Sequence, residues 1–595
     1  NGCDSIIETQ LTIDSIVLIN QSFSICSNDS LLVLGNYYDS AGIYYDTISV
    51  NNSCDTVLIT NLFMNPTYQD TLTLTVCDEF ISLSGDTISN TGIYYDTLSS
   101  INGCDSIITY DLTFNSNSYW GFDSDGIVWG ISDIGITKYS GDGTSRLYST
   151  YIGGNRCEVP HSLIVNNRNE LFVLGTTSSS NYPVTSGAFD PTFNGGSTAN
   201  LANGIFVNYT NGSDIVVSRL SADGSAMLAS TYVGGSENDG LNLNVDLVAN
   251  YADQMRGEII LDEFQNVVIG SSTASLDFPT TLGSYQNTYG GGDQDGVVFK
   301  MDEDLSGMIW SSYIGGSDAD GIYSIIQSNS SDVYVAGGTK SQNLSFPPGA
   351  YQSSYQGGIT DGFYAKLSGS GNSTLNGSYF GSDKYDQIYF VREDRNNQIY
   401  FYGQSDKFGD YWIKNADYNS PNSGQFISKL NVSHTELEWS TTFGSGDNKI
   451  NISPTAFLVD LCNKVYISGW GSSSSGFDHI GGNIADGTTD MEVTPDAYKS
   501  TTVGHDFYLM VLEDDASNLI YGSFYGGDES AEHVDGGTSR FDEKGVMYQS
   551  VCAGCSGNND FPIEPSNVVG PTNNGTFYSN PGCNNGVFKF DFGLP

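Results

Sequence analysis

The chain has few positive charges for its length. Its 595 residues include 21 Lys and Arg against 69 Asp and Glu, which gives a formal net charge of −48 at pH 7. Surfaces that bind nucleic-acid phosphates or lie on anionic lipids need clustered Lys and Arg. We therefore expect no nucleic-acid partner and no contact with an anionic membrane surface.

Long apolar runs are also missing. No stretch approaches the roughly 20 apolar residues that a membrane-spanning helix needs, so we expect no direct membrane insertion. Sustained 3.6-residue periodicity is almost absent, whereas short strand-like runs punctuated by Gly fill the chain. Because 38% of the residues are hydrophobic and 12% are aromatic, the chain can still bury sizeable cores. The sequence predicts an all-β protein with more than one folding unit.

The first residues lack the basic and apolar segments of a signal peptide. They instead repeat a later phrase, because the sequence from Asn1 to Ile6 is identical to that from Asn102 to Ile107. We expect that the chain starts inside a repeat and is a segment of a longer protein. Residues 1–13 would then be the end of a truncated module.

A period of about 50 residues organises the N-terminal part. The phrase from Gly42 to Thr47 returns from Gly92 to Thr97, and short runs of alternating polarity lie between these anchors. Alternation of this kind is typical of half-buried strands. We predict two small β-sandwich-like (Ig-like) modules, at residues 14–65 and 66–116.

The cysteines of these modules share the same period. Modules of this size have small cores and commonly rely on a disulfide. We predict the pairs Cys26–Cys54 and Cys77–Cys104, one in each module. Metal binding is the alternative, but a spacing near 27 residues without a CxxC or a histidine does not favour it.

The modules carry charge of one sign only. Fourteen acidic residues precede position 117, and the first basic residue is Lys138. Like charges repel one another along a chain. We expect this part to act as an extended spacer.

A triplet of Asp, then Ser or Thr, then a small aliphatic residue occurs ten times before residue 110. It can simply reflect strand edges, where Asp ends a turn and the next two residues open a strand. It also resembles the O-glycosylation signal of Bacteroidota, which would place bulky sugars on exposed strand edges. The candidate hydroxyls are Ser5, Ser15, Ser30, Ser40, Thr47, Thr56, Thr71, Thr87, Thr97 and Ser106.

A different repeat fills residues 117–595. The phrase from Ser149 to Gly154 recurs from Ser230 to Gly235 and from Ser311 to Gly316, with three weaker copies later. Two further strand patterns can each be counted seven times. We predict a β-propeller of seven blades, with six blades as the alternative if the short first unit merges with the last.

These phrases carry a resemblance to known families. The phrase from Ser149 to Gly154 and that from Asp295 to Lys300 resemble the SBBP β-propeller repeats of bacterial surface proteins. The Asn-Gly-Cys-Asp-Ser-Ile modules resemble those of very large Bacteroidota adhesins, including the gliding-motility class exported by the type IX secretion system. The resemblance implies a secreted or cell-surface location and an adhesive or structural role.

Three cysteines of the propeller are further disulfide candidates. Cys552 and Cys555 form a CxxC, and Cys583 is a competing partner. A single CxxC is weak support for zinc or redox chemistry, and a secreted location favours disulfides. Cys157 and Cys462 have no obvious partners.

Two sets of residues could bind ligands in the propeller. Asp-rich turns could bind structural calcium, although Asp also makes ordinary tight turns; no other cofactor is expected. Six copies of one counted strand carry a basic residue at the same position, and together these residues could form an anion-binding ring. The excess of acidic residues favours instead that each one pairs with a nearby Asp. The calcium candidates are Asp239, Asp293, Asp295, Asp318 and Asp320. The basic set is Lys138, Arg219, Lys300, Lys366, Lys429 and Lys589.

The sequence offers no motif that identifies a catalytic site. The five histidines are scattered, and neither HExxH nor GxSxG occurs. We expect a non-enzymatic adhesin segment, in which a glycosylated spacer presents a propeller that binds a glycan or a protein. A structural subunit of an extracellular filament or surface layer, with self-association, is the alternative. A propeller glycosidase or lyase with a carboxylate pair is the second alternative.

Overall fold

The computed structural model divides the chain into two compact units, Asn1–Val128 and Trp129–Pro595. Its described residues are almost entirely in strands and turns, with one short 3-10 helix, η1 (Asp253–Met255), which confirms the predicted all-β class. None of these residues forms a helix long and apolar enough to cross a membrane. The structure describes residues 16–27, 29–49, 55–65, 69–76, 80–81, 87–88, 92–99, 105–114, 132–201, 207–471, 487–534, 539–542, 544–555, 560–564, 566–570 and 584–593.

The first unit contains two three-stranded sheets with the same topology. In the first, β5 (Thr56–Asn65) pairs in parallel with β1 (Val17–Cys26) and antiparallel with β4 (Gly42–Ile48). In the second, β10 (Asp105–Phe114) pairs in parallel with β6 (Gln69–Val76) and antiparallel with β9 (Gly92–Ser99). The phrase that repeats in the sequence thus forms the same strand of each module. The described residues of the unit also form two small hairpins: β2 (Leu31–Val33) with β3 (Asn36–Tyr38), and β7 (Phe80–Ile81) with β8 (Thr87–Ile88).

A buried aspartate fixes the turn region of the first module. The Asp46 side chain is 5% exposed and accepts hydrogen bonds from the Tyr38 hydroxyl, at 2.6 Å, and the Asn36 amide, at 2.9 Å. Its counterpart Asp96 is buried in the same way. Because an unpaired buried carboxylate is costly, these contacts explain why the repeat needs Asp at this position.

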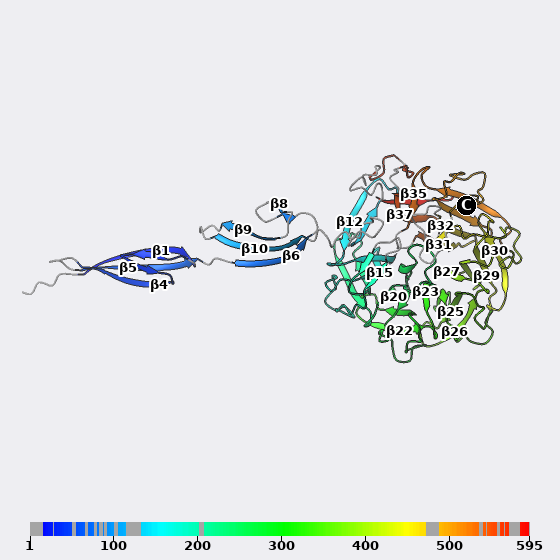
Figure 1. Cartoon of the computed structure of the whole chain (residues 1–595), viewed down its shortest axis with the longest axis horizontal. Coiled ribbons are helices and arrows are strands. Elements are labelled where there is room, and N and C mark those ends of the chain that lie inside the picture. Colours follow the sequence, from blue (N-terminus) through cyan, green and yellow to red (C-terminus); the bar gives the residue numbers. More distant parts are fainter. Residues whose placement is uncertain are drawn as a thin grey trace, which may run out of the picture. The chain divides into compact units, whose positions relative to one another are not determined.

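The second unit is a ring of seven sheets (Figure 1). We number them as blades 1 to 7 in chain order. Within a complete blade the strands run antiparallel and follow one another in sequence. The first strands of successive blades lie next to one another around the centre of the ring, so they are the inner strands of a β-propeller.

The strands of each blade have the following bounds. Blade 1 has β11 (Ile134–Tyr139) and β12 (Arg146–Ile152); blade 2 has β13 (Glu158–Val165), β14 (Leu171–Thr177), β17 (Asp214–Leu220) and β18 (Met227–Val233). Blade 3 has β19 (Glu258–Leu261), β20 (Val267–Thr273), β21 (Asp295–Met301) and β22 (Met308–Ile314); blade 4 has β23 (Asp320–Gln327), β24 (Val333–Thr339), β25 (Asp361–Leu367) and β26 (Thr374–Phe380). Blade 5 has β27 (Asp386–Glu393), β28 (Ile399–Ser405), β29 (Gln425–Leu430) and β30 (Leu437–Phe443); blade 6 has β31 (Ser453–Val459), β32 (Val465–Trp470), β33 (Phe507–Leu512) and β34 (Leu519–Tyr525). Blade 7 has β35 (Ala531–His533), β36 (Arg540–Phe541), β37 (Met547–Cys555) and β38 (Asn584–Phe590), and a hairpin of β15 (Ala199–Leu201) and β16 (Val207–Tyr209) lies between strands of blade 2.

The structure has seven blades and not six. Strands β11 and β12 form a sheet of their own and are not part of the sheet that contains β37 and β38. The ring closes between blades 1 and 7, where the Val569 amide donates a hydrogen bond of 3.1 Å to the Gly143 carbonyl. Residues 126–131, which the sequence predicts as the first copy of one of the two counted strands, lie outside the described residues.

The core lies between the blades. Every residue of β14, β20, β24, β28 and β32 is buried, because both faces of each sheet pack against neighbouring sheets. Between blades 2 and 3, for example, Phe172 and Ile215 pack with Ile259 and Val297 in one cluster. Each such side chain contributes roughly 1.5–3 kcal/mol when it is fully buried. Burial on both faces explains why these strands are nearly continuous runs of apolar and small residues.

Candidate functional site

Residues 241–257, which we call the plug, interrupt the inner strand of blade 3. Asp239 forms a bridge with Thr273 of β20, and Glu258 then pairs with Gly270 of the same strand. The plug is therefore an insertion between two parts of one inner strand. Its side chains are unusually buried for an insertion, and they include Leu241, Leu247, Val248, Tyr251, Asp253 and Met255.

The plug lies across the centre of the ring, because it contacts the inner strands of three other blades. Asn242 Nδ2 donates to the Tyr323 hydroxyl in β23 at 3.3 Å, Asn250 Nδ2 donates to the Tyr389 hydroxyl in β27 at 2.8 Å, and Arg256 Nη1 donates to the Pro454 carbonyl in β31 at 3.0 Å. Only a segment on the propeller axis can reach blades 4, 5 and 6 at once. The plug thus fills part of the axial channel.

Asp253 holds the plug in its fold. Its carboxylate is fully buried and accepts hydrogen bonds from the backbone N–H groups of Ala249 and Asn250, at 3.1 and 2.7 Å. It also accepts from the Tyr389 hydroxyl at 2.8 Å, Arg256 Nε at 2.9 Å and Asn250 Nδ2 at 3.3 Å. A buried carboxylate with this many donors orders the segment around it.

Beside the plug, an axial cavity of about 330 Å³ is lined by the inner strands of blades 2 to 7. Its lining includes Leu261, Gln327, Leu458 and Phe541, each near the end of an inner strand. The cavity therefore lies toward the short turns that join the first and second strands of the blades. A much smaller space of about 30 Å³, lined partly by plug residues, lies on the other side of Glu258.

Three charged side chains meet in the axial cavity. Arg540 Nη1 lies 2.8 Å from Glu258 Oε1, and Arg392 Nη2 lies 3.6 Å from the same oxygen. The second carboxylate oxygen, Oε2, accepts hydrogen bonds from the Ser324 hydroxyl at 2.9 Å and from the Ile325 N–H at 3.0 Å. We call Glu258, Arg392 and Arg540 the axial triad.

The axial triad carries a net positive charge. Burial would raise the pKa of the Glu258 carboxyl, but the charges of Arg392 and Arg540 outweigh burial and hold the pKa below its ordinary value. Glu258 is therefore ionised at neutral pH. Burial lowers the pKa of Arg392, but a guanidinium starts so high that it keeps its charge. Two cations thus face one anion.

Sequence reasoning did not find this site. The three residues come from β19, β27 and β36, and Arg540 is 282 positions away from Glu258. No local motif joins them. One signal of the plug was present in the sequence. The repeated phrase from Ser149 to Gly154 ends in Tyr-x-Gly-Gly, and the distance from this Tyr-x-Gly-Gly phrase to the next counted strand is longer before blade 3 than before blade 4. That extra length is the plug.

The structure distributes the five calcium candidates over several sites. Asp239 and Asp320 begin inner strands and accept hydrogen bonds from Thr273 and Thr339, while Asp295 accepts one from the Gly290 N–H at 2.6 Å. Asp293 accepts from Asn244 at 2.9 Å, and Asp318 lies 3.8 Å from the Lys340 ammonium. No group of three or more His, Cys, Asp or Glu that could hold a metal ion occurs in the described part of the chain. These residues serve as local acceptors, and calcium binding remains a prediction.

The Tyr-x-Gly-Gly phrase forms the junction between consecutive blades. At the junction of blades 3 and 4, the Gly316 N–H donates to Asp320 Oδ2 at 2.7 Å. A Cβ on Gly315 would overlap the Asp295 carboxyl, so only glycine fits. The same arrangement of two buried carboxyl groups recurs with Asp214 and Asp239, Asp361 and Asp386, and Asp506 and Glu532.

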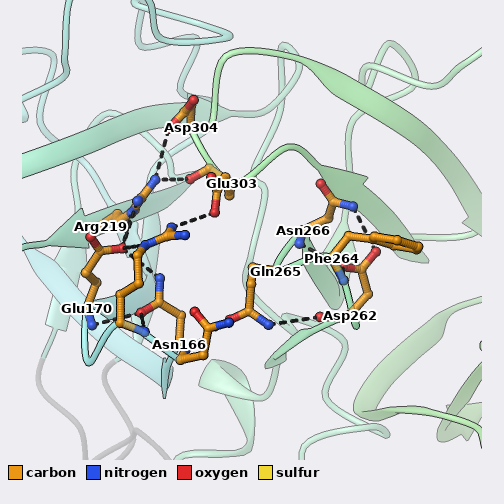
Figure 2. Close-up of polar contacts among 11 residues, drawn as sticks. Asn166, Glu170, Arg219, Asp262, Phe264, Gln265, Asn266, Glu303 and Asp304 are labelled. Atoms are coloured by element: carbon orange, nitrogen blue, oxygen red, sulfur yellow. Dashed lines mark hydrogen bonds and ion pairs between the residues drawn. The ribbon is translucent and has the colours of Figure 1, made fainter.

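Four of the six basic residues of the counted strand pair with nearby carboxylates, as expected. The other two do not pair with a carboxylate among the described residues: the Lys138 ammonium donates to the Ala222 carbonyl at 2.9 Å, and that of Lys589 lies over the Tyr548 ring. Arg219 lies 2.7 Å from Glu170 and 2.9 Å from Asp304, and Figure 2 shows this group between blades 2 and 3. In the same figure Asp262 accepts from the N–H groups of Phe264 and Asn266, both at 2.8 Å. The ammonium groups of three lysines also lie by carboxylates: Lys300 by Asp262 at 2.5 Å, Lys366 by Asp332 at 3.5 Å and Lys429 by Asp394 at 3.5 Å.

The glycosylation candidates of the first unit are largely accessible. The side chains of Ser30, Ser40, Thr47, Thr71 and Thr97 are exposed, and that of Thr56 is half-buried. Ser5, Ser15 and the side chains of Thr87 and Ser106 lie outside the described residues. Exposure permits modification, which remains a prediction.

One cysteine of the first module, Cys26, is disulfide-bonded. Its predicted partner Cys54, and the predicted pair Cys77 and Cys104, lie outside the described residues. In the propeller, Cys552 is buried in β37, Cys555 ends that strand, and Cys583 lies outside the described residues. Their pairing remains a prediction. Cys462 is an exposed free thiol.

No family model and no curated protein matches the chain. Among solved structures, it is similar to a mutant of NanB sialidase from Streptococcus pneumoniae, at 9% identity and a TM-score of 0.34, over 76% of this chain and 71% of that one. It is also similar to polysaccharide lyase Uly1, at 9% identity and a TM-score of 0.30, over 68% and 90% of the two chains. It is similar as well to a europium-containing methanol dehydrogenase, at 9% identity and a TM-score of 0.29, over 74% of this chain and 84% of that one. At such TM-scores none of these likenesses carries an argument about function.

Proposed function

We propose that the chain is a segment of a cell-surface adhesin, in which the N-terminal β modules act as a spacer and the propeller binds a surface glycan or protein. The axial cavity of about 330 Å³ is the observation that carries this proposal. Ligand pockets of proteins start near this volume and combine apolar walls with a few polar groups. The walls here include Ile164, Ile260 and Phe457, and the polar groups are the axial triad.

The chemistry of the cavity favours binding over turnover. Glycoside hydrolysis in most families uses two carboxyl groups, one of which is protonated to act as an acid. Among the described residues that line the cavity, Glu258 is the one carboxylate, and two guanidinium groups keep it ionised. A carboxylate held in this way is suited to positioning cations and is poorly suited to donating a proton.

Two features of the first unit support an extracellular location. Cys26 is disulfide-bonded, and structural disulfides persist in oxidising compartments. Five of the ten candidate hydroxyls are exposed, so an external glycosylation system could reach them. Export by a type IX system and a role in gliding motility follow from the resemblance of the repeated phrases and belong to the same proposal.

Two measurements test the proposal. Arrays of glycans and of extracellular matrix proteins are probed with the whole purified chain, and we expect saturable binding to at least one glycan or protein. Intact-mass analysis of the chain from its native source should show excess mass that maps to residues 1–110. A chain that binds nothing on either array, and whose native mass equals that of the bare polypeptide, would contradict the proposal.

A further inference from the structure

The axial triad differs from every other ion-pair group in the described part of the chain. Elsewhere the acids equal or outnumber the cations: Arg168 and Arg219 share Glu170, Glu303 and Asp304, and Lys499 has Asp506 and Asp528. In the axial triad two cations share Glu258. A partly buried excess charge is unfavourable unless another group compensates it. In a chain of net charge −48, this excess requires a specific explanation.

The two guanidinium groups also have more N–H donors than the described residues satisfy. Each carries five N–H donors. Arg540 donates to Glu258, Ser162 and the Ile259 carbonyl, while its Nε is buried without a partner among the described residues. Arg392 donates to the carbonyls of Phe457 and Val391 and to Ser324. About four of the ten donors are left for other acceptors, counted in this way.

The shape of the site restricts what can reach these donors. The plug occupies the channel on one side of Glu258, so a ligand enters from the side of Leu261, Gln327 and Leu458. Apolar side chains line the way in and lower the local dielectric, which strengthens interactions with charge. The volume suits one ring-sized group and is too small to admit more of a protein partner than an inserted side chain.

Among the described residues, the acidic side chains near this end of the channel do not cancel the excess. Asp262 and Asp394 are paired with Lys300 and Lys429, and Glu393 accepts a hydrogen bond from the Asn329 N–H at 2.7 Å. Charges farther away are screened within about 8 Å at physiological ionic strength. An anion in the cavity therefore interacts mainly with Arg392 and Arg540.

We propose that the axial cavity binds the carboxylate group of an acidic sugar, held by the guanidinium groups of Arg392 and Arg540. Guanidinium matches the planar carboxylate with paired N–H donors. The apolar walls, with the half-buried Phe541, suit the carbon-rich face of a sugar ring. This inference deepens the proposed function by naming the class of glycan and the residues that select it.

The site can be tested without disturbing the axial triad. Gln327 lines the cavity and is half-buried, and it is not part of the triad. Gln327→Glu puts a negative charge beside the ligand carboxylate, whereas Gln327→Met keeps the size of the side chain and adds no charge. Both variants should unfold at the same temperature as the parent, which separates a binding effect from misfolding.

Calorimetric titration of the whole chain compares methyl glucuronide with methyl glucoside, which lacks the carboxylate. We expect the glucuronide to bind at least tenfold more tightly, and Gln327→Glu to weaken its binding at least tenfold. Gln327→Met should stay within threefold of the parent. Arg392→Ala, checked for folding by circular dichroism, should also abolish the preference for glucuronide.

The other outcomes are equally informative. Equal affinity for the two sugars, or an unchanged affinity in Gln327→Glu, overturns the inference. Tighter binding of a phosphorylated sugar, or of a peptide that ends in a free carboxylate, overturns the assignment to acidic sugars. If the chain binds array ligands but not glucuronide or other acidic sugars, the inference fails while the proposed function stands. If it binds nothing on the arrays, the proposed function fails as well.

Discussion

The junctions between blades are of two kinds. At the junction of blades 3 and 4, Gly315 lies against the carboxyl group of Asp295, and Gly316 donates to Asp320. At the junction of blades 5 and 6, the corresponding Gly444 lies against the Asn451 carboxamide and the Ser423 hydroxyl. The first kind has two buried carboxyl groups and the second has none.

The comparison shows that the junction does not need charge. In both kinds, the residue after the first glycine donates its N–H to a side-chain oxygen at the start of the next blade: Asp320 in one and Asn451 in the other, at 2.7 and 2.9 Å. An uncharged amide thus takes the place of a carboxyl group, and the hydrogen bond from the backbone N–H is kept. We infer that the carboxyl junctions are also neutral over part of the pH range and retain protons there.

The pKa values of the buried pairs agree with this inference. Burial raises the pKa of Asp295 to about 8 and that of Asp361 to about 8, and a neighbouring carboxyl adds to the effect in each case. Burial likewise raises the pKa of Asp320 to about 7 and of Asp386 to about 6. Carboxyl groups with such values hold protons near neutral pH.

The largest effect is expected from filling the space at a carboxyl junction. Gly315→Ala puts a methyl group against Asp295, with no room for it to move. Overpacking of this kind costs about 3 kcal/mol, and a marginally stable propeller can lose its fold at that cost. Urea unfolding measures the loss. Gly141→Ala is the matched control, because nothing lies within 4 Å of an added Cβ there. Equal stability of the two variants would show that the junction is not tightly packed.

The comparison also explains how much the sequence predicted. The Tyr-x-Gly-Gly phrase marked six outer strands correctly, because Gly315 and its counterparts are fixed by close packing, and packing constraints of this kind repeat with the blade. The repeat from Gly42 marked the modules for a similar reason, since Asp46 must reach Tyr38. Contacts between residues that are close in the sequence therefore produce repeated sequence patterns, from which the strands could be predicted.

The axial triad left no such signal in the sequence. Glu258 and Arg540 meet only because the ring brings blades 3 and 7 to one axis, and their contact has no fixed spacing. The plug was marked in the sequence only by its extra length before blade 3, and its position in the channel could not be predicted for a different reason. Its polar residues, such as Asn242 and Asn250, are typical of a surface loop, and only the closed ring supplies Tyr323 and Tyr389 as partners.

The second effect is a dependence of stability on pH. The carboxyl groups of the junctions have folded-state pKa values above the unfolded value near 4. Their stabilising contribution is therefore complete below pH 4 and is lost as the pH rises through about 6 to 8, the values of Asp386 and Asp295. Each retained proton gives a slope of about 1.4 kcal/mol per pH unit. We expect the midpoint temperature of thermal unfolding to decrease as the pH is raised from about 5.5 to about 9.

Repulsion between surface carboxylates must be separated from this effect. Surface charges are screened by salt, whereas buried pairs are screened much less. The fall in the midpoint should therefore persist at about 1 M NaCl. Glu258 has a lowered pKa, so its contribution is lost only on acidification and does not affect this window. A midpoint that rises from pH 5.5 to 9 would contradict the retained protons.

The smallest effect comes from exchanging the two kinds of junction. Asp361→Asn replaces one of the two carboxyl groups at the junction of blades 4 and 5 with a neutral amide and keeps Asp386, the counterpart of Asn451. Asp361 Oδ1 has no partner among the described residues, so the amide replaces no hydrogen bond there. Ser423 is 1% exposed, and Ser423→Asp makes the opposite change. We expect Asp361→Asn to unfold near the parent at pH 5.5 and to be about 1 kcal/mol more stable at pH 9.

Ser423→Asp should lose about 1 kcal/mol at pH 9 and less at pH 5.5, because a protonated carboxyl is neutral as the hydroxyl is. The control is Asp417→Asn, which removes the same charge from an exposed position and should leave the pH slope unchanged. Urea titrations at the two pH values measure all three. The two junction variants change the slope in opposite directions only if the buried carboxyl groups titrate between about pH 5.5 and 9. Slopes that follow the control would mean that these carboxyl groups keep one protonation state over this range, which would contradict the inference.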